Sequence, residues 1–95
     1  MAKITEDKVT NRSIVCSGEV KLEFIELDAS SGSTGDYVVS NLQNPQVAYV
    51  TYKDSVGLKT GDAEVDSTQE SGKAVVLRSG LSGNTDGTLV VVVGY

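Results

Sequence analysis

Short apolar runs separated by turn-forming residues organise the chain. Clusters of glycine, asparagine, serine and the one proline interrupt the sequence every few residues, a pattern typical of strands joined by turns. The fifteen valines and eight threonines agree with this, because β-branched side chains pack well on a pleated sheet. We therefore predict an all-β fold, a small antiparallel β-sandwich or barrel of about 6–8 short strands. The predicted strands are 3–10, 13–16, 19–27, 37–40, 46–53, 63–68, 74–79 and 88–93.

The segment 19–27 carries an interrupted alternation. Val20, Leu22 and Phe24 alternate with charged residues, and Ile25 then shifts the apolar positions by one. Such a shift predicts a β-bulge within the strand. The same residues also allow a helical interpretation, but we favour a strand, because the flanks are turns and the segment is short for a helix.

Three predicted strands are apolar on both faces. They are 46–53, 74–79 and 88–93. A strand of this kind has to be covered on both sides, whereas a small sandwich covers only its inner face. We therefore expect a loop, an arm or a neighbouring subunit over the outer faces, and we predict self-association.

The 95 residues suffice for one domain. We divide them into an N-terminal arm or edge strand, 1–12, and a single β-sandwich or barrel domain, 13–95. The first segment holds charges of both signs, with Ile4 and Val9 as its sizeable apolar residues. It is either a frayed terminus or an arm that becomes ordered on a neighbouring subunit through these two residues.

Four further residues are candidates for protein contact. Val56 and Leu58 lie in the turn-rich segment 54–62, where they either fold back onto the domain or contact a partner. Tyr49 and Tyr52 lie on opposite faces of one predicted strand. They therefore do not form one stacking platform for nucleic-acid bases.

Catalytic chemistry has little support in the sequence. Histidine is absent, which removes the commonest general base and metal ligand. Glu23 and Glu26 are expected to point outward and to be solvated, and Cys16, within an apolar run, is expected to be a buried and inert thiol. We predict that the protein is not an enzyme, has no catalytic residues and uses no cofactor.

Metal binding is also not predicted. Asp62, Glu64 and Asp66 share one face of a predicted strand by the two-residue period. No Asp-x-Asp-x-Asp-Gly calcium loop accompanies them, so we interpret them as a solvated strand face.

The formal net charge of −5 opposes binding to nucleic-acid phosphates, so no nucleic-acid partner is expected. The longest apolar run, 89–93, is far shorter than the roughly 20 residues that span a membrane, and we expect no membrane partner. The first residues carry acids in place of the basic and apolar regions of a secretion signal. We therefore expect synthesis in a cytoplasm.

An acidic all-β chain with a charged start, rich in Val, Thr, Ser and Gly and ending in Gly-Thr-Leu-Val-Val-Val-Val-Gly-Tyr, resembles the small virion proteins of tailed bacteriophages. It is most similar to their capsid decoration, or cement, proteins. The resemblance implies a compact β-barrel or sandwich, often trimeric, that lies on the capsid of the virion and braces neighbouring capsomers. It implies the major capsid protein or other virion subunits as partners, and a homo-oligomer. The alternatives are a ligand-binding or adhesive β-module, for example carbohydrate-binding, and a small phage tail component.

Overall fold

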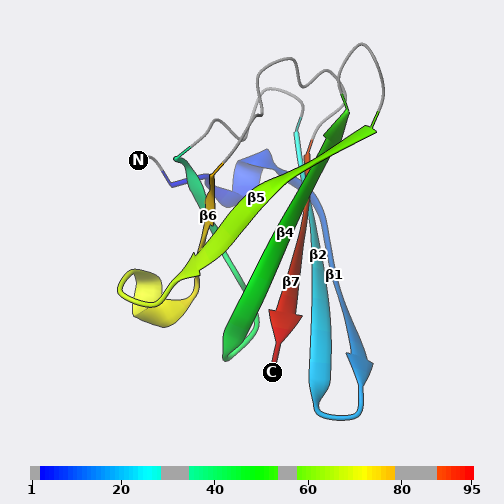
Figure 1. Cartoon of the computed structure of the whole chain (residues 1–95), viewed down its shortest axis with the longest axis vertical. Coiled ribbons are helices and arrows are strands. Elements are labelled where there is room, and N and C mark those ends of the chain that lie inside the picture. Colours follow the sequence, from blue (N-terminus) through cyan, green and yellow to red (C-terminus); the bar gives the residue numbers. More distant parts are fainter. Residues whose placement is uncertain (1–2, 29–34, 54–57, 79–87) are drawn as a thin grey trace.

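The computed structural model describes residues 3–28, 35–53, 58–78 and 88–95. Its strands form one antiparallel sheet that curls into a half-barrel (Figure 1). This confirms the predicted all-β antiparallel fold. The described part contains no helix long and apolar enough to cross a membrane.

Seven strands and two single-turn 3-10 helices make up the described chain. In chain order they are η1 (Glu6–Lys8), β1 (Val9–Ser17), β2 (Val20–Leu27), β3 (Tyr37–Val39), β4 (Pro45–Lys53), β5 (Leu58–Asp66), η2 (Glu70–Gly72), β6 (Ala74–Leu77) and β7 (Thr88–Gly94). The order across the sheet is β1-β2-β7-β4-β5-β6-β3. The C-terminal strand β7 therefore lies between β2 and β4, and β1 and β3 form the two edges.

The N-terminal third differs from the prediction in two places. The segment 3–10 is not one strand, since Lys3 makes a single bridge to Tyr37 and η1 follows before β1 begins. The break predicted at 11–12 is also wrong, because β1 is continuous, with a register shift between Val9 and Asn11 instead. The physical reason is the path of the chain, which has to turn from the β3 edge to the β1 edge before it can pair with β2.

The β-bulge predicted at Ile25 is absent. From Lys21 to Leu27, β2 pairs with β7 in an unbroken register. Its inner face carries Glu23, Ile25 and Leu27, all buried. Its outer face carries Val20, Leu22 and Phe24. The prediction failed because it placed Glu23 in solvent, whereas this carboxylate occupies an inward position.

The core fills the inside of the half-barrel. Strands β4 and β7 contribute alternate residues to it, such as Val50 and Val90, and all four residues of β6 are buried on both faces, as the doubly apolar pattern of that strand indicates. The buried apolar cluster comprises Ile4, Ile25, Leu27, Val38, Leu42, Ala48, Val50, Val75, Leu77, Val90 and Val92.

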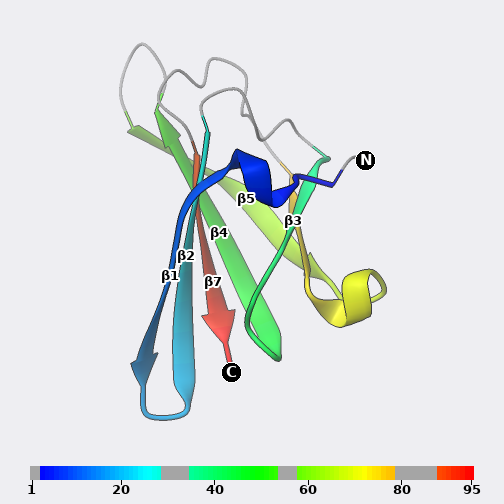
Figure 2. The same ribbon diagram turned by 180° about the vertical axis from the view of Figure 1, so that it is seen from behind.

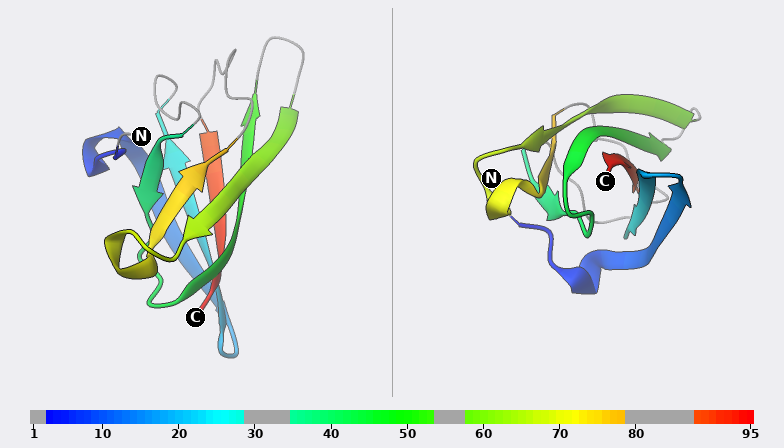
Figure 3. Two further views of the ribbon diagram at one scale, coloured as in Figure 1. Left: turned by 60° about the vertical axis from the view of Figure 1, so that its left-hand side comes forward. Right: turned by 90° about the horizontal axis from the view of Figure 1, so that it is seen from below.

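The N-terminal segment crosses the open side of the half-barrel (Figure 2). The Ile4 N–H donates to the carbonyl of Tyr37 in β3 at 2.7 Å, and η1 then leads into β1 at the other edge. Seen along the barrel in Figure 3, this segment runs between the two edge strands. The N-terminal segment thereby links the edge strands β3 and β1, which do not pair with each other in the sheet.

The end of β7 lies tightly against the start of β4. Asn44 and Tyr95 exchange main-chain hydrogen bonds of 3.0 and 3.1 Å, and Gly94 is buried beside them. A Cβ at Gly94 would lie 2.8 Å from the Cα of Pro45 and closer still to the carbonyl of Asn44. Glycine is required here because the two backbones approach each other too closely for any side chain.

Candidate protein-binding surface

The outer face of β1, β2, β7 and β4 carries aligned rows of apolar residues. Directly opposite residues on paired strands share a face, so the strand registers define the rows. In the central row, Phe24 lies opposite Val91, and Val91 lies opposite Tyr49. We call the whole set the outer apolar face; it comprises Val15, Val20, Leu22, Phe24, Val47, Tyr49, Leu89, Val91 and Val93.

Several of these side chains are open to solvent. The exposed fraction is 57% for Tyr49, 51% for Val15, 45% for Val47 and 42% for Val20. The N-terminal segment crosses the opposite, open side of the half-barrel (Figure 2). Contiguous exposed apolar surface of this kind is typical of interaction sites, so we treat this face as a candidate site.

Acidic residues border the outer apolar face. Glu26 is exposed in the row that contains Leu89, and Asp62 of β5 lies directly opposite Tyr49. Glu64 is also exposed, and its Oε1 accepts a 2.6 Å hydrogen bond from Nε of Arg78. The border is consistent with the net charge of −5. A complementary surface is therefore apolar at its centre and basic at its rim.

Of the four predicted contact residues on and after β4, the structure describes the side chain of Tyr49 alone. Tyr49 lies on the exposed outer face. Leu58 is the first residue of β5 and pairs with Lys53. The side chains of Tyr52 and Leu58, and the whole of Val56, lie outside the described residues.

Both anchors of the N-terminal segment contact the protein's own core. Ile4 is buried in it, and Val9, half-buried at the start of β1, packs against it. Their contacts are therefore intramolecular in the single chain. The ordering of segment 1–12 on a neighbouring subunit stays a prediction.

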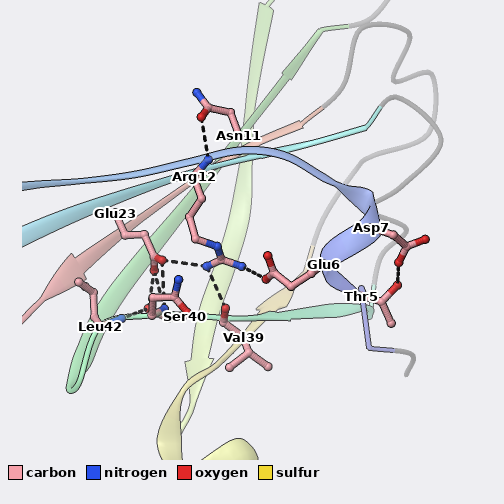
Figure 4. Close-up of polar contacts among 10 residues, drawn as sticks. Thr5, Glu6, Asp7, Asn11, Arg12, Glu23, Val39, Ser40 and Leu42 are labelled. Atoms are coloured by element: carbon pink, nitrogen blue, oxygen red, sulfur yellow. Dashed lines mark hydrogen bonds and ion pairs between the residues drawn. The ribbon is translucent and has the colours of Figure 1, made fainter.

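A buried polar cluster links β2 to the connection after β3, and the sequence reasoning missed it (Figure 4). Glu23 was expected to be solvated, but its side chain has no exposed surface. Arg12 Nη1 lies 2.8 Å from Glu23 Oε2, and the Ser40 hydroxyl donates to Glu23 Oε1 at 2.6 Å. The Asn41 N–H donates to both carboxylate oxygens at 3.0 Å.

The cluster is completed by further contacts of Arg12 and Ser40. Arg12 also donates to the carbonyl of Val39 at 3.1 Å and forms an ion pair with Glu6. The Ser40 hydroxyl accepts the Leu42 N–H at 3.0 Å. These bonds fasten β1 and β2 to the end of β3 across the open side. Since Glu23 and Ser40 are buried, the cluster acts as a structural latch and not as a site that a substrate can enter.

A sequence signal for this latch did exist. Arg12 and Glu23 both occupy inner positions of the hairpin around Gly18, on adjacent rows, with Arg12 opposite Ile25 and Glu23 opposite Ile14. Diagonal neighbours of opposite charge on one face of a hairpin can reach each other. An inward ion pair was thus compatible with the spacing.

Cys16 is exposed, so the prediction of a buried thiol is wrong. Its position is on the inner face, opposite Lys21. Cys16 lies on the edge strand β1, close to the tip of its hairpin with β2, and this tip extends beyond the end of β7 (Figure 1). Ile14, on the same face of this edge strand, is 44% exposed, although Glu23 opposite it is buried.

The acidic residues of β5 do not gather into a metal site. Asp62 and Glu64 are exposed on the strand, and within the described residues no group of three or more potential ligands is placed to hold a metal ion. Asp66 instead accepts hydrogen bonds from the hydroxyl and N–H of Thr68, at 2.6 and 2.9 Å, and from Gln69. The bond from the Thr68 hydroxyl is the largest of the causes that lower the pKa of Asp66.

Comparison with known proteins assigns no family. No protein-family model matches the chain, and neither a curated protein nor a solved structure matches it.

Proposed function

We propose that the chain is a non-enzymatic structural protein of a bacteriophage virion, a capsid decoration or cement protein that binds and stabilises neighbouring capsid subunits. The observation that carries the proposal is the outer apolar face, with Phe24, Val91 and Tyr49 in its central row. Isolated chains leave this face in water at a free-energy cost, which association with another protein surface removes.

The acidic residues at the border of the outer apolar face restrict which protein surfaces can bind it. Because Glu26 lies in the row of Leu89, and Asp62 and Glu64 lie beside the apolar rows on β5, the capsid surface that fits is apolar with lysine or arginine along the matching border. The major capsid protein is the proposed partner, and the virion is the proposed location after synthesis in the host cytoplasm. The resemblance to decoration proteins adds a homo-oligomer.

A rigid scaffold suits this role. The sheet is continuous from one edge to the other, the latch of Arg12 and Glu23 joins its two sides, and the N-terminal segment bridges its edges. A preorganised surface loses little conformational entropy on binding, so more of the contact energy appears as affinity.

An adhesive or carbohydrate-binding module is the second candidate. It is favoured by the 57% exposure of Tyr49, since an exposed aromatic ring on a flat sheet can stack against a sugar. This function requires the ring of Tyr49 and not the surrounding valines, which separates it from the capsid proposal.

The test is association with particles. Recombinant protein is mixed with purified capsids that lack it, the capsids are sedimented, and the bound protein is quantified together with the temperature at which the capsids break open. We expect saturable binding and a higher disruption temperature. Absence of binding to capsids, combined with binding to immobilised glycans, would overturn the proposal in favour of the adhesive module.

A further inference from the structure

The two edges of the sheet are protected unequally. The edge strand β3 receives the N-terminal segment, through the bridge of Lys3 to Tyr37 and the hydrogen bond from the Ile4 N–H. The other edge strand, β1, pairs only with β2 in the described part of the chain. Its outward edge faces away from the half-barrel in Figures 1 and 2. An open edge presents main-chain donors and acceptors that a further strand can use.

The open edge also lacks the features that normally prevent strand addition. Proteins protect edges with lysine, proline, outward charges or bulges. In β1 the only charged residue is Arg12, which turns inward to Glu23, and the register shift lies at the start of the strand, before Asn11. The stretch 13–17 therefore has a regular register and carries no charge.

Side chains on both faces of this stretch are exposed. Val15 lies on the outer face, opposite Leu22, and is 51% exposed; Ile14 lies on the inner face, opposite Glu23, and is 44% exposed. Cys16 is exposed on the inner face as well. Apolar groups on both faces at an open edge gain burial from a neighbouring strand, which covers the two faces together.

The stretch reads nearly the same in both directions. Its sequence is Ser13-Ile14-Val15-Cys16-Ser17, with a small hydroxyl residue at each end and apolar residues between. A two-fold contact requires such self-complementarity, because each residue meets its counterpart in reverse order. We propose that a second copy of this protein adds its β1 antiparallel to β1, about a two-fold axis through Val15.

In this register Val15 lies opposite Val15 of the partner subunit, and Ile14 lies opposite Cys16 of the partner subunit. Every opposed pair is apolar with apolar or hydroxyl with hydroxyl, and no like charges meet. The two-residue turn at 18–19 makes Ser17 and Val20 a hydrogen-bonded pair, so alternate residues direct their main chain away from β2. These are Ile14 and Cys16, the residues that exchange hydrogen bonds between the copies.

The contact leaves most of the outer apolar face available. Only Val15 belongs to both surfaces, whereas Phe24 and Tyr49 lie on β2 and β4. Because the two Val15 side chains point to the same face, the outer faces of both copies lie on one side of a continuous sheet. The dimer would then bind an assembly through two equivalent surfaces, which raises its apparent affinity. The inference does not depend on the identity of that assembly.

The test measures the mass of the full chain in solution. Sedimentation equilibrium over a hundredfold range of concentration should show a reversible dimer, twice the 10.0 kDa of the chain. Val15→Lys places two like charges opposite each other and should yield monomers at every concentration. The matched control is Thr60→Lys, which adds the same charge at an exposed position of β5 and should dimerise as the unmodified protein does.

A cross-link tests the register independently. Opposed Cβ atoms in such a pair are about 4.5–5.5 Å apart, near the separation that a disulfide spans. The variant Val15→Cys with Cys16→Ser should therefore form disulfide dimers on mild oxidation, whereas Ser13→Cys with Cys16→Ser should not. A monomer or trimer in the unmodified protein, or a dimer that Val15→Lys leaves intact and Val15→Cys fails to cross-link, would overturn the proposal. Capsid binding through Tyr49 is a separate measurement, so either proposal can fail without the other.

Discussion

Arg12 and Glu23 form an ion pair inside the half-barrel, with 2.8 Å between Nη1 and Oε2. The Glu23 side chain is fully buried, and that of Arg12 is 12% exposed. A buried charge is tolerated only when it is paired and hydrogen-bonded, and here Ser40 and the Asn41 N–H complete the shell around the carboxylate. The pair joins β1 to β2, and the bonds to Val39 and Ser40 couple both strands to the end of β3 at the far side of the sheet.

Replacing one partner of this pair should be costly. Arg12→Met leaves the Glu23 carboxylate buried without its counter-ion, and we expect the free energy of unfolding to fall by about 3–5 kcal/mol. Urea denaturation followed by circular dichroism measures the change.

The matched control for that variant is Arg78→Met. Arg78 pairs with Glu64 at 2.6 Å, but both side chains are substantially exposed, so the loss should stay below about 1 kcal/mol. Equal effects of the two substitutions would contradict the assignment of Arg12 and Glu23 as a latch.

Gly94→Ala should destabilise the junction of β7 and β4. The new methyl group meets Pro45 and the carbonyl of Asn44, both main-chain contacts that cannot rotate away, and we expect a loss of about 1–3 kcal/mol. Thermal unfolding gives the measurement. Gly18→Asn serves as the comparison, because Gly18 has open space around it and asparagine tolerates its positive φ. A Gly94→Ala protein as stable as the parent would contradict the close approach.

Ile4→Ala tests whether the N-terminal segment belongs to the folded domain. Ile4 is buried within the core, so the truncation should lower the free energy of unfolding by about 2–4 kcal/mol. Val47→Ala, at an exposed position of β4, should cost much less. Chemical denaturation separates the two. An unchanged stability in Ile4→Ala would mean that the segment is an independent arm.

Asp66 should make the free energy of unfolding depend on pH in the acidic range. Hydrogen bonds, first from the Thr68 hydroxyl, lower the pKa of Asp66 below its ordinary value of 3.8 in the folded protein. The stabilisation is complete above pH 3.8 and is lost as the pH falls through the lowered pKa, because protonation then costs more in the folded than in the unfolded state. Melting temperatures of the parent and of Asp66→Asn should differ at pH 6 and converge toward pH 2. A difference that grows in acid would contradict this sign.

The sequence was sufficient for the positions of most strands and for the burial of β6 on both faces. It was also sufficient for the alternation in β4 that puts Tyr49 and Val50 on opposite faces. These features follow from local residue patterns with a period of two. The same patterns predicted apolar residues on the outer faces of three strands, which a loop, an arm or a neighbouring subunit would have to cover. Tyr49, on the outer face of β4, is exposed in the structure.

Other features depend on contacts between distant residues. The alternation of apolar and polar positions placed Glu23 outside, and only the opposite charge of Arg12, its diagonal neighbour in the hairpin, was compatible with the inward position that the structure shows. Nor could the alternation show that Cys16 is exposed, because this follows from the position of β1 at the edge of the sheet. Sheet order, with β7 between β2 and β4, likewise requires the three-dimensional structure.

Binding of outer-face variants to capsids tests the central proposal most directly. Tyr49→Asp places a charge in the middle of the outer apolar face, and Ser67→Asp adds the same charge at an exposed turn away from it. We expect both proteins to fold, because both positions are exposed, and their circular dichroism spectra check this. In sedimentation with purified capsids, Tyr49→Asp should bind roughly 30-fold or more weakly, as expected for a residue at the centre of an interface, while Ser67→Asp binds like the parent. Equal capsid affinities of Tyr49→Asp and the parent protein would contradict a role of this face in the virion.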